Sequence, residues 1–115
     1  MKCAIYVRVS TKKQEYETQL KELREYVERQ GWQAVEYCEK KTAKTGSKRP
    51  ELARLFEDAR LHKVEVVVTW KIDRFGRSFS DFVTNVSLLD SYEVRFIALS
   101  QSIDTDKRNP LHHLR

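Results

Sequence analysis

The sequence predicts an α/β domain with a mostly parallel central sheet and helices on both faces. Short segments rich in β-branched residues alternate along the chain with segments whose apolar residues recur at helical spacing. One short segment, Val66-Val67-Val68, is continuously apolar, which is typical of a central parallel strand covered on both faces. Strands that alternate with helices form right-handed βαβ units, so neighbouring strands should run parallel.

The N-terminal half is predicted to hold two strands around one helix. Cys3 to Val9 is apolar and β-branched, as a first buried strand would be, and we expect Gln33 to Glu39 to form an outer strand beside it. The helix between them ends at Gly31, a plausible C′ residue, and its apolar face is Tyr16, Leu20, Leu23 and Val27. The basic segment from Lys40 to Lys48 is expected to be a poorly ordered loop.

The C-terminal half is predicted to continue the alternation. Pro50 suits the first turn of a helix with an apolar face of Leu52, Leu55, Phe56 and Ala59. Val64 to Trp70 is the next strand, and either Ser78 or Ser80 can cap the helix that follows it. Val94 to Leu99 completes the expected sheet.

The two cysteines are expected to be reduced thiols in the core. Cys3 and Cys38 fall near opposite ends of neighbouring parallel strands, which places them roughly 13 Å apart. That separation is beyond the reach of a disulfide.

Size and charge narrow the classes of function. With 115 residues the chain suits one domain with one core, and its net charge of +5 favours a polyanionic partner without identifying one. No apolar run approaches the ~18 residues that a membrane span needs, so we expect a cytoplasmic protein without a membrane partner.

Serine and arginine side chains are predicted to meet beyond the carboxyl ends of the strands, where open parallel sheets bind ligands. Alternation puts Arg8 and Ser10 on one side of the first strand, and Arg74 and Arg77 follow the strand that ends at Trp70. If these strands are neighbours, a serine hydroxyl faces three arginines. Guanidinium groups hold the charge of a phosphoryl-transfer transition state, and a serine among them can act as a covalent nucleophile.

Each of these residues alone has a simpler explanation. Ser10 could be a helix cap or loop serine, and Arg74 with Arg77 could be a solvated basic turn. Thr11 and Gln14 also fit a capping box, which leaves a catalytic role for Gln14 open. The order and spacing of longer motifs decide between these readings.

Three motifs in order resemble the serine recombinase family of resolvases, invertases and phage integrases: YVRVSTKKQ at 6–14, RPEL at 49–52 and WKIDRFGRS at 70–78. ETQL at 17–20 and SIDTD at 102–106 extend the resemblance over essentially the whole chain. It implies a resolvase-like catalytic domain over residues 1–115, cut off at Arg115, where the family's long dimerisation helix should begin.

The resemblance also implies a mechanism of site-specific DNA recombination. Ser10 would attack a DNA phosphodiester, form a 5′-phosphoserine linkage and release a 3′ hydroxyl. The wider site would comprise Arg8, Arg49, Arg74 and Arg77 as phosphate ligands, Asp73 as a further catalytic residue, and Tyr6, Gln14 and Gln19 in support. The family needs no metal and no cofactor, because the bond energy is stored in the protein–DNA linkage. Its partners are double-stranded DNA and further copies of the chain, as a homodimer that assembles to a homotetramer.

Two departures and two alternatives remain. Thr42-Ala43 stands where the family usually has Ser-Gly, and Glu93 stands where a glycine often precedes the next strand. One alternative is a recombinase-like DNA-binding or assembly module that is inactive in isolation, because the dimerisation helix and DNA-binding domain are missing. The other is a flavodoxin-like or receiver-type signalling domain, which would place acids or a phosphate loop where this chain has Arg and Ser.

Overall fold

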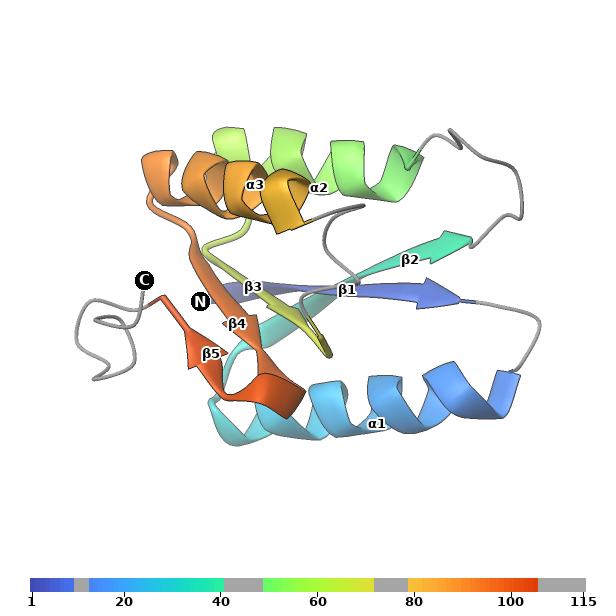
Figure 1. The fold of residues 1–115 in the computed structure, drawn as a ribbon. Coiled ribbons are helices and arrows are strands. Elements are labelled where there is room, and N and C mark those ends of the chain that lie inside the picture. The colour runs from blue at the N-terminus through green and yellow to red at the C-terminus, as the bar shows by residue number, and fades with distance from the viewer. Residues whose placement is uncertain (10–12, 41–48, 72–78, 106–115) are drawn as a thin grey trace.

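The computed structural model describes residues 1–9, 13–40, 49–71 and 79–105 (Figure 1). In chain order its elements are β1 (Lys2–Val9), α1 (Lys13–Arg29), β2 (Gln33–Lys40), α2 (Pro50–Arg60), β3 (Val66–Thr69), α3 (Phe79–Ser91), β4 (Arg95–Ala98), the 3-10 helix η2 (Leu99–Gln101) and β5 (Ile103–Asp104). Among the described residues no helix is long and apolar enough to span a membrane.

The five strands form one sheet in the order β2-β1-β3-β4-β5. β1 pairs in parallel with β2 on one side and with β3 on the other, and β3 pairs in parallel with β4. This confirms that the first and third predicted strands are neighbours and that the second lies outside the first. β5 pairs antiparallel with β4, and the sequence did not predict it because two residues carry no periodicity.

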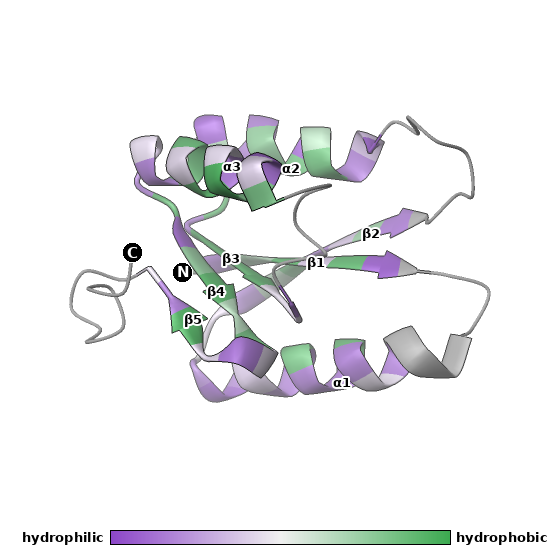
Figure 2. Ribbon diagram, in the orientation of Figure 1, coloured by the Kyte–Doolittle hydropathy of each residue, from purple (hydrophilic) through white to green (hydrophobic). Residues whose placement is uncertain are grey.

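Helices cover both faces of the sheet, as predicted. α2 and α3 lie on one face and α1 lies on the other (Figure 1). Alternate residues of each strand therefore enter two separate apolar cores: Tyr6 and Val67 pack beneath α2 and α3, whereas Ile5, Val66 and Val68 pack against α1. In Figure 2, green dominates β3, whereas the outer strand β2 and the helix α1 mix green with purple. All three valines of β3 are fully buried, which confirms the prediction of a central strand.

The predicted helix ends are correct where the structure describes them, with one exception. Gly31 has a φ of +77° just past α1, which a glycine adopts without strain. Pro50 is the first residue of α2. Ser80 lies inside α3 and cannot be its cap, because the helix already begins at Phe79. The other candidate cap, Ser78, lies outside the described residues, as do residues 41–48 of the expected loop.

Two sequence predictions about strand residues need correction. The third and fourth strands are shorter than predicted, because Val64 and Val94 are buried in the core without joining the ladder. Cys3 is buried as expected, but Cys38 is exposed. Cys38 lies on the outer strand of the sheet, on the opposite face from the buried Tyr37, where α1 leaves it uncovered.

Candidate active site at the carboxyl edge of the sheet

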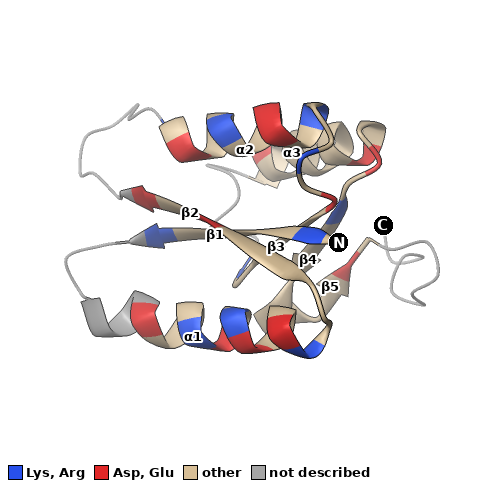
Figure 3. Ribbon diagram, turned by 180° about the vertical axis from the view of Figure 1, so that it is seen from behind, with Lys and Arg blue, Asp and Glu red and all other residues tan. Residues whose placement is uncertain are grey.

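Arg8 and Glu39 lie opposite each other at the carboxyl edge of the sheet. They are register partners in β1 and β2, one residue before each strand ends. Figure 3 shows blue on β1 and red on β2 towards this end of the strands. The chain leaves β1 after Val9 and continues directly to Ser10. Since residues two apart in a strand share a face, Arg8 lies on the same face as Tyr6, beneath α2 and α3.

Glu39 is buried and holds the start of α2. Its side chain is 2% exposed, and its two carboxylate oxygens accept hydrogen bonds from the backbone N–H groups of Glu51 at 3.2 Å and Leu52 at 3.1 Å. Arg49, the N-cap residue of α2, makes no side-chain capping bond itself. A carboxylate from a neighbouring strand thus performs the task that a capping side chain usually performs, and its charge complements the helix dipole.

Tyr6 of β1 also contacts Glu39. Its hydroxyl donates a hydrogen bond to Glu39 Oε1 at 3.4 Å, and its ring is fully buried. Burial raises the pKa of Tyr6 well above its usual value, the negative charge of Glu39 raises it further, and the guanidinium groups of Arg49 and Arg8 oppose the rise. All three charged groups are therefore close enough to act on one phenol. We call Tyr6, Arg8, Glu39 and Arg49 the Tyr6 cluster.

Arg49 carries a buried donor that lacks an acceptor among the residues that the structure describes. Its Nη1 atom is shielded from solvent and has no hydrogen-bond partner within the part of the chain that the structure describes. Buried guanidinium donors in proteins are almost always paired, so an unpaired one marks a place where an anion fits. Arg49 occupies the start of α2, where the helix dipole also favours negative charge.

A hydrogen bond also links β3 to β1 near this edge. The Thr69 hydroxyl donates to the backbone carbonyl of Tyr6 at 3.0 Å, and both groups are buried. Thr69 is the last residue of β3, and the chain continues from it towards the segment that contains Asp73, Arg74 and Arg77. The segments after β1 and β3 thus leave from neighbouring strands.

Comparison with known proteins identifies the family. Residues 3–114 match the family model described as the resolvase N-terminal domain. The chain belongs to the resolvase family. This confirms the resemblance drawn from the sequence motifs.

Relatives of this resolvase-family chain are similar over much of its length. It is 36% identical over 100 residues to the serine recombinase gin of Escherichia phage Mu, covering 87% of this chain and 48% of that protein. It is 41% identical over 61 residues to the transposon Tn552 DNA-invertase BinR of Staphylococcus aureus, covering 53% of this chain and 31% of that protein. The chain therefore spans half or less of the length of these relatives.

A solved structure supports the same fold. The N-terminal catalytic domain of TP901-1 integrase superposes with a TM-score of 0.83 at 32% identity, over 99% of this chain and 87% of that chain. The expected resolvase-like fold is confirmed.

The structure brings together some of the predicted site residues of this resolvase-family domain. Tyr6, Arg8 and Arg49 form one cluster, as described above. Gln19 is half-buried on α1, which covers the opposite face of the sheet, and its side chain makes no hydrogen bond within the described residues. The remaining predicted residues lie outside what the structure describes: Ser10, Asp73, Arg74 and Arg77 entirely, and Gln14 in its side chain.

Glu39 is the site residue that sequence reasoning missed. It ends a strand and precedes a basic segment, where a solvated acid is common. Alternation with the buried Tyr37 could have indicated an inward side chain. Its partners lie at the start of α2, which the sequence alone does not place beside β2. Within the described residues, no group of three or more His, Cys, Asp or Glu side chains could hold a metal ion.

Proposed function

We propose that this chain is the catalytic domain of a site-specific recombinase that cuts and rejoins DNA strands, with Ser10 as the nucleophile. The family and the names of the relatives support this class of reaction. The observation that carries the proposal is the Tyr6 cluster. It gathers two arginines at the end of β1, directly before Ser10, and one of them has a buried donor without a partner among the described residues.

The chemistry is a phosphoryl transfer that needs no redox partner. The Ser10 oxygen attacks the phosphorus, an Oγ–P bond forms, and the bond to the 3′ oxygen breaks. The serine proton leaves and the released 3′ oxygen takes up a proton, so the DNA end becomes a 3′ hydroxyl. Rejoining reverses these steps when a 3′ hydroxyl attacks the phosphoserine. Two phosphoester bonds of similar energy are exchanged, so the reaction needs no nucleotide as a source of energy.

The Tyr6 cluster supplies the positive charge and fixes its position. Arg8 and Arg49 can donate to the non-bridging oxygens of the phosphate, which gain charge in the transition state. Glu39 ties α2 to β2 and thereby fixes the backbone that carries Arg49. Tyr6 remains a neutral phenol that donates to Glu39. Arg74 and Arg77 complete the set of phosphate ligands, with Asp73, Gln14 and Gln19 in support.

The partners of the whole protein follow from this chemistry. Its substrate is double-stranded DNA, because recombination exchanges both strands of two duplexes. Four strand breaks need four nucleophiles, which a homotetramer formed from two homodimers provides. The isolated domain should bind DNA weakly, with little sequence preference and with strong salt dependence, since arginine contacts to phosphates carry no base information.

The test is formation of a covalent protein–DNA adduct. The full-length protein is incubated with DNA that carries its own recombination site, quenched with detergent and separated by denaturing electrophoresis. Wild type and Ser87→Ala, a control at an exposed serine of α3, should form the adduct with or without EDTA. Ser10→Ala should form none while binding DNA normally. An adduct that survives Ser10→Ala, or that EDTA abolishes, would overturn the proposal. DNA binding without any wild-type adduct would favour a binding or assembly module instead.

A further inference from the structure

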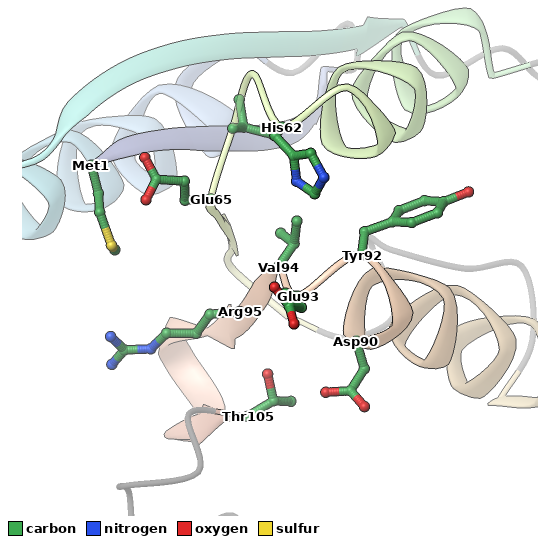
Figure 4. A pocket seen from close by; sticks show the side chains of 10 residues that line it. Met1, His62, Glu65, Asp90, Tyr92, Glu93, Val94, Arg95 and Thr105 are labelled. Carbon is green, nitrogen blue, oxygen red and sulfur yellow. The ribbon is translucent and has the colours of Figure 1, made fainter.

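A pocket opens at the opposite end of the strands from the Tyr6 cluster. Met1, Glu65 and Val94, which directly precede β1, β3 and β4, all line it (Figure 4). Its volume of about 680 Å³ falls within the range of known ligand sites, ~300–1,000 Å³. The Tyr6 cluster contributes no residue to the lining. A molecule bound here could therefore act while DNA occupies the candidate active site.

The pocket combines apolar side chains with acidic walls. Met1 is exposed and Tyr92 is half-buried, whereas Val64 and Val94 are buried in the core beneath α2 and α3. Three exposed carboxylates, those of Glu65, Asp90 and Glu93, line the pocket from separate positions around it (Figure 4). A ligand that fits must offer an apolar stem and a positively charged end.

Two helix ends place side chains at this pocket where glycine is usual. His62 and Glu93 follow α2 and α3 with left-handed φ values of 59° and 62°. Both lie in Schellman-type turns, in which the next residue's N–H bonds to a carbonyl five residues earlier. A glycine at either position would remove an imidazole or a carboxylate from the lining.

No cation from the described part of the chain pairs with the carboxylates of the pocket. Within the described residues the side chains of Glu65, Asp90 and Glu93 make no hydrogen bond and no ion pair, whereas several other acids are paired with an arginine: Glu36 with Arg24, Glu51 with Arg54 and Glu57 with Arg60. Arg95 also lines the pocket, but both carboxylate oxygens of Asp104 bind its guanidinium. The other positive group is the amino group of Met1. The lining therefore keeps an excess of negative charge on a chain whose net charge is +5.

We propose that this pocket binds an arginine or lysine side chain of a partner protein. The methylene stem packs on the accessible surface of Met1 and Tyr92, while the charged end lies among the carboxylates, the arrangement that long basic side chains favour. The same carboxylates repel phosphate, so DNA is not the occupant. The proposal goes beyond strand exchange and does not depend on the identity of the nucleophile.

The test is a nuclear magnetic resonance titration of the 115-residue chain with a short peptide that contains two arginines. A second peptide with citrulline in place of arginine keeps the shape and removes the charge. The arginine peptide should shift the backbone amides of Glu65, Tyr92 and Val94 saturably, with the citrulline peptide about tenfold weaker. The double variant Asp90→Asn/Glu93→Gln should weaken arginine binding about fivefold or more, and Glu28→Gln, at an exposed site on α1, should not.

Three results would overturn the proposal: equal binding of both peptides, no saturable shift at the pocket, or tighter binding of a matching glutamate peptide. Thermal melting of each variant separates loss of binding from loss of folding. A change in the same amides with protein concentration alone, removed by the double variant, would support the proposal and identify a second copy of the chain as the source of the basic side chain.

Discussion

Replacing Glu39 with alanine should destabilise the domain by about 2 kcal/mol. The change removes the cap of α2, which consists of the hydrogen bonds from the Glu51 and Leu52 N–H groups and is worth about 1 kcal/mol. It also removes the acceptor of the buried Tyr6 hydroxyl, at about 1 kcal/mol, the lower end of the usual range because this contact is long, at 3.4 Å. For a domain of this size the loss corresponds to a fall in Tm of roughly 8 °C.

The matched control is Glu36→Gln on the same strand. Glu36 forms a solvent-exposed ion pair with Arg24, whose side chain is 54% exposed, so its loss should change stability by less than about 1 kcal/mol. Urea unfolding followed by circular dichroism measures both variants, and an unchanged m value would confirm that the same unfolding transition is compared. If Glu39→Ala loses no more stability than Glu36→Gln, Glu39 does not hold the start of α2, and the account of how Arg49 is positioned is wrong.

The other predictions concern thiol reactivity, alkaline stability and catalysis. An aromatic disulfide reagent at pH 8 should label Cys38 and leave Cys3 unmodified. Burial raises the pKa of Cys3 to about 12 and so reduces the fraction of its thiolate form about a thousandfold. Equal labelling of both cysteines in the folded protein would contradict the burial of Cys3. Stability should fall as pH rises above about 10, since burial raises the pKa of Tyr6 in the folded state and the unfolded state loses that proton first. Tyr6→Phe should flatten this fall, and an unchanged alkaline profile in urea titrations would show that Tyr6 does not contribute. Arg74→Lys should slow strand cleavage by about 10²–10³, because an ammonium cannot hold two phosphate oxygens in one plane; near-normal cleavage in single-turnover assays would remove Arg74 from the phosphate site.

Periodicity made most of this fold predictable. The continuous valines of β3 indicate a buried central strand, and the helical spacing of Leu20, Leu23 and Val27 indicates an amphipathic helix. The sheet order, which places β3 beside β1, agrees with the predicted parallel sheet. Burial at the edge of the sheet was harder to predict. A cysteine usually lies in the core, but the exposure of Cys38 on an outer strand depends on how far α1 extends across the sheet.

The candidate site was predictable only where a motif carried it. Arg8 and Arg49 stand in recognisable motifs, and the structure places both beside Tyr6. Glu39 has no such signal, because its role arises from hydrogen bonds to backbone N–H groups that lie 12 and 13 residues away along the chain. The acidic pocket depends in the same way on Met1, the turns after α2 and α3, and Thr105, which only the folded sheet brings together. Residues that act through tertiary contacts alone therefore escape a sequence pattern.

The most direct measurement is the chemical identity of the protein–DNA linkage. The adduct of the full-length protein is trapped on its own recombination site, digested with trypsin and nuclease, and sequenced by mass spectrometry. We predict a 5′ phosphate on the serine of the tryptic peptide Val9–Lys12, which contains Ser10, and a free 3′ hydroxyl that a polymerase can extend. A phosphate on any other residue, or attachment through a 3′ phosphate, would contradict the assignment of Ser10 as the nucleophile.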